Sequence, residues 1–269
     1  MKRFIFNYTI EEVAPFIDWS YFLHAWGIAG KRESTQAKEI IADAHAMLHE
    51  CNGRYRTKAI FALCDAKSDG DDIIIEGTTL PLLRQQHCAD GEYNLCLSDF
   101  VSPHGDRIGL FATSVEEGFG KEYASDDYKR LIAQTLADRL AETTATLLHR
   151  QVRTREELWG YAPDEQLTTE ELFAERNRGI RPAVGYPSLP DQSIIFTIDK
   201  LLHLREAGIK LTPNGAMTPH ASVCGLMIHH PVAQYFAVGK IDSEQLEDYA
   251  ARRGIPSAEL ARFLAKNIG

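Results

Sequence analysis

The sequence lacks a continuous run of the roughly 20 apolar residues that a helix needs to cross a bilayer. Residues 1–7 are also too short for the apolar region of a secretory signal peptide. The five cysteines are odd in number and scattered, so neither a disulfide framework nor a thiolate zinc site is expected. These absences predict a cytoplasmic chain with reduced thiols.

Basic residues are also fewer than acidic ones. The 269 residues carry 29 Lys and Arg against 38 Asp and Glu, which gives a formal net charge of -9. An acidic surface repels the phosphates of nucleic acids, so nucleic acid is not an expected partner, and neither is a membrane. Internal repeats and low-complexity linkers are absent, which favours a single domain over residues 1–269.

The N-terminal half contains a mixture of helical and strand patterns. Apolar residues three and four apart predict a helix over residues 34–51 and a long, proline-free helix over residues 125–158. Runs of β-branched and apolar residues predict three strands, with a turn at residues 67–71 between the first two: residues 58–64, 72–76 and 106–115.

The C-terminal half continues with shorter elements. Thr168 and Glu171 form a capping box for a helix that should end near Gly179. Residues 181–190 hold three prolines and a glycine, which predicts an ordered loop rather than a helix or a central strand. The remaining predicted elements are helices over residues 191–206, 243–252 and 256–266 and strands over residues 221–228 and 235–241. Because strands and helices do not alternate regularly, this order predicts an α+β fold with an antiparallel sheet.

Common site signatures are incomplete in this sequence. His45 and His49 lie four residues apart, but the glutamate of a zinc-protease motif is missing, so no metal site is expected. Asp43 and His45 begin a cobalamin-binding pattern in which Leu48 replaces the required glycine, so the chain is not expected to hold cobalamin by itself. No serine hydrolase elbow is present either.

The segment around Arg181 is the most informative one. Pro182 and Pro187 can hold the guanidinium in a fixed geometry that suits bidentate binding of a carboxylate. Gly185 between them lets a ligand lie against the main chain. The alternative is a surface loop that the prolines merely shape, with Arg181 in a salt bridge to a neighbour. Both interpretations are open at this point.

Six short patches follow one another from residue 16 towards the C-terminus. They are residues 16–19 (Phe-Ile-Asp-Trp), 137–142 (Ala-Asp-Arg-Leu-Ala-Glu), 159–163 (Trp-Gly-Tyr-Ala-Pro), 179–187 (Gly-Ile-Arg-Pro-Ala-Val-Gly-Tyr-Pro), 221–223 (Ala-Ser-Val) followed by His230 and Pro231, and 235–238 (Tyr-Phe-Ala-Val). Together they resemble the activation domain of cobalamin-dependent methionine synthase. The resemblance covers nearly the whole chain.

This resemblance implies a C-shaped α+β domain built around a twisted antiparallel sheet flanked by helices. In that family the domain binds S-adenosylmethionine and reactivates cobalamin that has oxidised to cob(II)alamin. An electron from flavodoxin or a similar reductase gives cob(I)alamin, which the S-adenosylmethionine methyl group traps as methylcobalamin. The chain is then a methyltransferase component of methionine biosynthesis and not a complete methionine synthase. Its expected partner is a cobalamin-binding methionine synthase module, supplied in trans.

The resemblance also implies which residues contact S-adenosylmethionine. Arg181 matches the arginine that binds the carboxylate, and Asp18 matches the acid that receives the amino group. These residue types suit the ligand's charges, and methyl transfer needs positioning rather than a general base. The other expected site residues are the ligand-lining pair Tyr235 and Phe236, the loop residues Ala183, Gly185 and Tyr186, and the nearby acids Glu142 and Glu175.

Alternatives are open for several of these assignments. Asp18 also suits a helix N-cap, Glu142 could pair with a residue one turn away on its helix, and Tyr235 could be an ordinary strand aromatic. His220 and Gln192 depart from the residues that relatives commonly carry. Two other functions fit the same residues: a non-catalytic S-adenosylmethionine-binding sensor or docking module, and a reactivator of another corrinoid methyltransferase.

Overall fold

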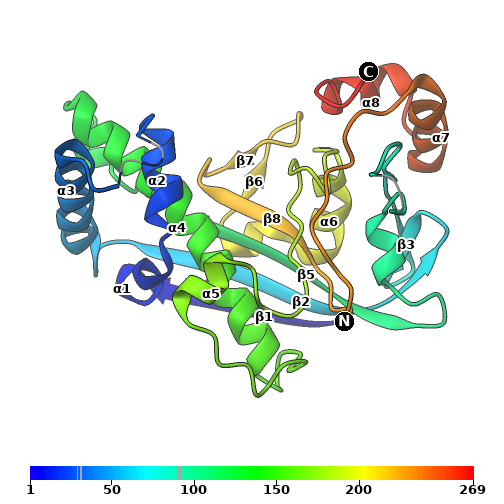
Figure 1. Ribbon diagram of the computed structural model, residues 1–269, viewed down its shortest axis with the longest axis horizontal. Helices are drawn as coiled ribbons and strands as arrows, with labels where there is room; N and C mark the ends of the chain where they lie inside the picture. The colour runs from blue at the N-terminus through cyan, green and yellow to red at the C-terminus, as the bar shows by residue number, and fades with distance from the viewer. Residues whose placement is uncertain (29, 31, 90–91) are drawn as a thin grey trace.

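A twisted antiparallel sheet runs through the molecule (Figure 1). The computed structural model describes residues 1–28, 30, 32–89 and 92–269. The strand order is β4-β3-β2-β5-β8, and β1 pairs with β2. The strands of this sheet are β1 (Lys2–Thr9), β2 (Arg56–Asp69), β3 (Asp72–Ile75), β4 (Thr78–Pro81), β5 (Asp106–Val115) and β8 (Ser222–Met227). A separate two-stranded ribbon contains β6 (Lys210–Leu211) and β7 (Met217–Thr218).

The long strand β2 organises the sheet because two strands share one of its edges. Residues 56–63 of β2 pair with β1, and residues 66–69 pair with β3. Strand β5 pairs with the opposite edge over residues 57–66. All of these pairs are antiparallel, as the sequence predicted.

Helices cover both faces of the sheet. Helix α4 contacts β2, β5 and β8 on one face, and α6 contacts the same three strands. Adjacent residues of β5 show the two faces directly: Thr113 donates to Ala141 O on α4 at 2.9 Å, and Ser114 donates to Ala207 O at 2.8 Å. The helices are α1 (Ile10–Val13), α2 (Trp19–Ala25), α3 (Thr35–Cys51), α4 (Asp127–Thr154), α5 (Thr169–Phe173), α6 (Ile194–Leu202), α7 (Ser243–Arg253) and α8 (Ser257–Phe263).

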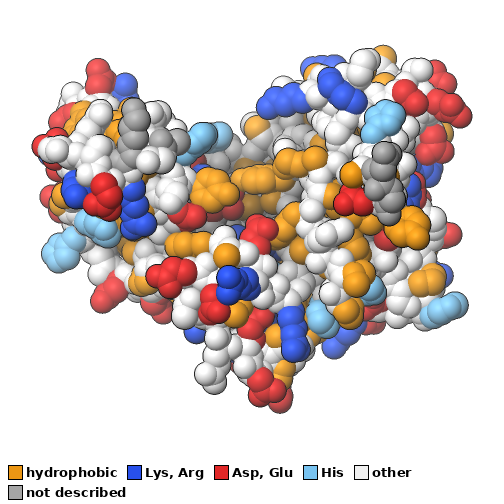
Figure 2. Space-filling model, in the orientation of Figure 1, with side chains coloured by type: hydrophobic (Ala, Val, Ile, Leu, Met, Phe, Trp, Pro, Cys, Tyr) orange, Lys and Arg blue, Asp and Glu red, His pale blue; other side chains and the backbone are white. Residues whose placement is uncertain are grey.

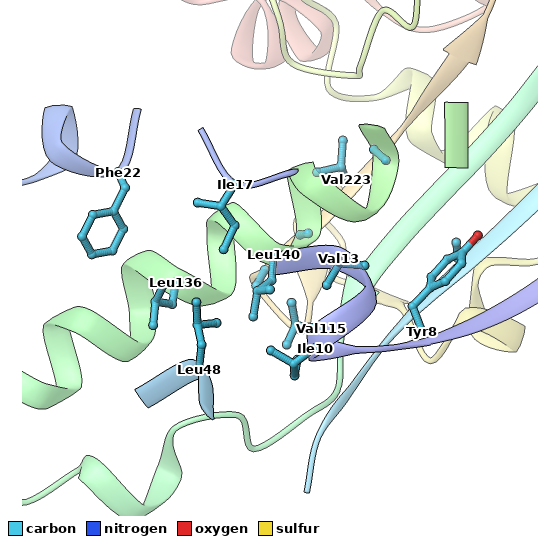
Figure 3. Packing of buried hydrophobic residues seen from close by; sticks show 14 of the residues in the cluster. Tyr8, Ile10, Val13, Ile17, Phe22, Leu48, Val115, Leu136, Leu140 and Val223 are labelled. Atoms are coloured by element: carbon cyan, nitrogen blue, oxygen red, sulfur yellow. The ribbon is translucent and has the colours of Figure 1, made fainter. Parts of the chain in front are cut away.

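The two faces of the sheet bury separate hydrophobic cores. On the α4 face, Ile10 and Val13 of α1 pack near Leu140 of α4 (Figure 3). On the other face, alternate strand residues such as Ile60 and Leu110 pack with α6. A third, smaller cluster joins α7 and α8. Within the described residues, no helix is long and apolar enough to span a membrane.

The molecule has the expected C shape. Helices α2 and α3 lie at one end, with the N-terminal part of α4, and α7 and α8 lie at the other (Figure 1). The space-filling view shows a deep hollow between the two ends, with hydrophobic side chains along its floor (Figure 2). The α+β class with a curled antiparallel sheet is therefore confirmed.

Several predicted elements need correction. Residues 235–241 form no strand. The neighbouring arginine-containing segment holds prolines, which cannot donate to a ladder. Val238 N alone makes a backbone hydrogen bond to that segment within the described residues, to Pro187 O at 2.9 Å. Helix α5 ends at Phe173 rather than near Gly179, since Glu175 adopts a φ of 54° that a helix does not tolerate. The turn predicted at residues 67–71 is tighter, because pairing continues to Asp69 and Asp72.

Gly225 gives a test of how the proline loop packs on β8. A Cβ at this position would overlap Pro182 O and lie 2.8 Å from Ala183 Cα. Backbone atoms cannot move aside as a side-chain tip can, so Gly225→Ala should lower the free energy of unfolding by about 2 kcal/mol in a urea titration. Hydrogen exchange should accelerate at Val184 N–H, which bonds Cys224 O. Unchanged exchange at Val184 would contradict the close approach, and amides of the β2–β5 pair serve as the control.

Candidate functional site

A cavity of about 650 Å³ lies beside α4, a volume that suits a small-molecule ligand. The rest of its wall comes from the start of α2, the α5 region, residues 181–188, residues 235–236 and two sheet residues, Phe111 of β5 and Val223 of β8. These segments are far apart in the sequence. The fold therefore brings together most of the patches that carried the resemblance.

Helix α4 contributes one continuous stripe to the cavity. Residues three and four apart on a helix share a face, and this is the spacing of the α4 residues in the wall. The helix begins cleanly because Asp126 accepts a hydrogen bond from Lys129 N at 3.1 Å, and no proline interrupts it. The stripe consists of Arg139, Glu142, Thr143, Ala145, Thr146, His149 and Arg153.

The arginine loop, residues 179–187, is held along the free edge of β8. Ile180 N donates to Ile228 O, Leu226 N donates to Pro182 O, and Val184 N donates to Cys224 O, each at 2.9 Å. This irregular pairing extends the sheet by one segment. Arg181 and Ala183 of this segment line the cavity.

The Arg181 guanidinium has no acidic partner among the residues that the structure describes. Its Nη2 donates to Thr146 Oγ1 at 2.9 Å, and its backbone N–H donates to the Tyr235 hydroxyl at 2.9 Å. The structure therefore does not support the alternative that Arg181 forms a salt bridge to a neighbouring residue. A guanidinium in a cavity wall that donates to a neutral hydroxyl and forms no salt bridge can receive a carboxylate.

Asp18 caps a helix and also lines the cavity. Its Oδ1 accepts a hydrogen bond from Ser20 N at 2.8 Å and caps α2, and the residue also lines the cavity. Thr143 of α4 donates to Phe16 O at 3.4 Å, which ties this segment to the cavity floor. The capping bond involves only one of the two carboxylate oxygens.

Glu142 pairs across the cavity rather than along its helix. The Tyr186 hydroxyl donates to Glu142 Oε1. Partial burial, together with the Glu142 carboxylate, raises the pKa of Tyr186 above its ordinary value. Glu175 is exposed and lines the same cavity. Both predicted acids therefore lie at the site.

Tyr235 and Phe236 enter the wall from an irregular segment. The Tyr235 hydroxyl accepts the Arg181 N–H, and partial burial raises the pKa of Tyr235. Phe236 N donates to Ser188 Oγ at 3.2 Å, and its ring packs against Phe100 with centroids 6.4 Å apart. The strand-aromatic alternative for Tyr235 does not apply, because this segment is not a strand.

Gly185 is the one predicted site residue that lies outside the cavity wall. Its φ of 85° and its N–H bond to Leu189 O at 2.8 Å close a tight turn in the arginine loop. A Cβ there would lie 2.7 Å from Gln192 Oε1. In this structure the glycine shapes the loop that presents Arg181 and Tyr186.

Two buried ionisable residues of the wall were missed from the sequence. His149 is 2% exposed, and its Nε2 lies 2.8 Å from the Tyr161 hydroxyl. Arg153 is 1% exposed and donates through Nε to Glu165 Oε2 at 2.6 Å. Their helical spacing from Glu142 was the available signal. No group of three His, Cys, Asp or Glu in the described part of the chain could hold a metal ion.

His149 predicts a pH dependence of stability. Burial lowers the pKa of His149 well below its ordinary value, with help from Arg153 and Arg181, so the folded chain keeps the ring neutral. In the unfolded chain the ring binds a proton below about pH 6.5. The free energy of unfolding therefore falls as the pH drops below that value, by up to about 1.4 kcal/mol per pH unit. Urea titrations at about pH 7 and about pH 5.5 measure this loss in the free energy of unfolding, and it should be smaller for His149→Gln than for wild type. Equal losses would contradict the assignment.

Comparison with known proteins identifies the family. The chain matches the family model for the vitamin B12 dependent methionine synthase activation domain over residues 9–254. It is also similar to a crystal structure of the MetH reactivation domain bound to AdoHcy, with a TM-score of 0.92 and 37% sequence identity over 100% of this chain and 91% of that chain. Both matches include the cavity and the arginine loop. The chain therefore belongs to the activation domain family of vitamin B12-dependent methionine synthase.

Proposed function

We propose that the cavity binds S-adenosylmethionine, and that the chain uses it in the reductive methylation of cobalamin carried by a partner methionine synthase module. The observation that carries this proposal is the Arg181 guanidinium, which lines the cavity without an acidic partner among the described residues. Asp18 in the same wall supplies the opposite charge. The related reactivation domain was solved with AdoHcy, the demethylated form of this ligand.

The charges of the wall match the three charged groups of S-adenosylmethionine. Arg181 offers two parallel N–H donors for the carboxylate, and Asp18 offers an acceptor for the ammonium group. Glu142 and Glu175 place negative charge in the same cavity, and the Tyr186 and Tyr235 rings add electron-rich faces that favour the sulfonium.

Exposed aromatic side chains line the cavity and offer a surface for the corrinoid. Between 37% and 65% of each of these residues is exposed, and because they line one cavity they form an aromatic patch of the kind that contacts a partner. They can lie against a flat, largely apolar macrocycle brought by another module. The residues are Tyr21, Phe173, Tyr186 and Tyr235.

The chemistry divides between the ligands and the chain. When bound, the corrinoid supplies its cobalt, reduced by one electron from flavodoxin or a similar reductase, as the nucleophile that takes the methyl group. The carbon–sulfur electron pair returns to sulfur, which becomes a neutral thioether. Arg181 and Asp18 hold the amino acid end and thereby set the line of displacement. The Glu142 carboxylate favours the positive sulfonium over the neutral thioether product, and this difference assists release of the product.

Arg181→Ala tests ligand binding. Removing a charged bidentate donor should weaken S-adenosylmethionine binding at least about tenfold in a calorimetric titration. Arg176→Ala is the matched control, because Arg176 is exposed, lies outside the cavity wall and should leave the affinity unchanged. Equal affinity of wild type and Arg181→Ala would place the ligand elsewhere.

Methyl transfer distinguishes the proposed function from a sensor. The chain is mixed with a cobalamin-loaded methionine synthase module, a reductase system and S-adenosylmethionine labelled in its methyl group. Labelled methylcobalamin should form with wild type, and its rate at low ligand concentration should fall at least about tenfold with Arg181→Ala. Tight ligand binding without labelled product would instead indicate a sensor or docking module.

A further inference from the structure

The segment after α4, residues 159–163, lies behind the arginine loop and folds back on its helix. Gly160 N donates to Val152 O at 3.0 Å, and Ala162 N donates to Arg153 O at 2.8 Å. None of residues 159–163 belongs to the cavity wall, so ligand contact does not explain this Trp-Gly-Tyr-Ala-Pro patch.

Both backbone polar groups of Arg178 are held by side chains from this region. Arg178 N donates to Glu165 Oε1 at 3.0 Å, and Arg178 O accepts from the Tyr161 hydroxyl at 3.4 Å. Arg178 lies three residues before Arg181. Fixing its peptide groups therefore fixes the direction in which the chain enters the arginine loop.

Buried side chains of α4 support the two residues that hold Arg178. His149 Nε2 lies 2.8 Å from the Tyr161 hydroxyl, and Arg153 Nε donates to Glu165 at 2.6 Å. The hydroxyl has a single proton, so donation to Arg178 O leaves its oxygen to accept from a neutral His149 that carries its proton on Nε2. The low pKa of His149 agrees with that neutral form.

The position of the Tyr161 ring is closely defined. It stacks on His229 with centroids 4.1 Å apart and an interplanar angle of 11°, and Trp159 packs edge-on at 4.9 Å. On the loop side, a Cβ at Gly179 would lie 2.7 Å from the Tyr161 hydroxyl. Only glycine allows this approach, and its φ of 72° favours glycine independently.

We propose that Tyr161 is a positioning residue that, through the Arg178 carbonyl, aims Arg181 at the ligand carboxylate. The inference rests on the proposed binding of S-adenosylmethionine. It assigns to the Trp-Gly-Tyr-Ala-Pro patch a role in carboxylate selectivity, although no residue of the patch lies in the cavity wall.

Tyr161→Phe tests this role with two ligands, S-adenosylmethionine and decarboxylated S-adenosylmethionine. The variant keeps the stacked ring and loses only the hydroxyl. Its Kd for S-adenosylmethionine should rise about three- to tenfold, whereas the Kd for the decarboxylated ligand should stay within about twofold of wild type. In an Arg181→Ala background, Tyr161→Phe should have no further effect on either ligand.

Tyr8→Phe is the matched control. The Tyr8 hydroxyl also bonds an α4 side chain, Gln151 Oε1 at 2.7 Å, but Tyr8 lies outside the cavity wall. This variant should leave both affinities unchanged. Equal weakening of both ligands by Tyr161→Phe, or an effect that persists without Arg181, would overturn the positioning role while leaving the proposed function intact. Failure of wild type to bind S-adenosylmethionine at all would refute the proposed function and this inference together.

Discussion

The packing of α4 across the sheet is the constraint on which the rest of the structure depends. One stripe of this helix, including Leu136, Leu140 and Leu148, is completely buried in the core. Because that stripe sets the rotation of the helix about its axis, the adjoining polar stripe must face the cavity. The position of α4 therefore determines where Thr146 meets Arg181 and where His149 and Arg153 meet the segment behind the arginine loop.

Electrostatics adds a second constraint. The chain carries a net charge of -9, yet Arg181 in the cavity wall forms no salt bridge within the described residues. The nearby acids are engaged elsewhere, since Asp18 caps α2 and Glu142 accepts from Tyr186. Desolvating a cation without a counter-charge costs free energy, and a carboxylate ligand recovers that cost.

Periodicity and capping made much of the fold predictable. The strand at residues 106–115 and the helix at residues 34–51 agree with β5 and α3 almost to the residue, because alternation and helical spacing report directly on burial. The strand expected at residues 235–241 failed because the loop beside it contains prolines, and a single segment does not reveal its partner. Strand β1 was not predicted either, although every one of its residues pairs with β2.

The candidate site was predictable only through resemblance. Spacing alone could not separate a ligand-binding Arg181 from a surface arginine, and the structure supplies the missing fact, which is that the guanidinium forms no salt bridge in the described chain. His149 and Arg153 escaped notice because polar residues on a long helix normally face solvent. Their burial depends on Tyr161 and Glu165, which come from another segment. The residue spacing within one helix does not reveal such contacts.

The attachment of the arginine loop on two sides has a thermodynamic consequence. Its first half is bonded to β8, and Arg178 just before Arg181 is bonded to side chains supported by α4. Ordering a free backbone costs about 1–2 kcal/mol of conformational entropy per residue. A loop that is already ordered does not incur this cost again when a ligand arrives, so the contacts of Arg181 translate into affinity with little entropic loss.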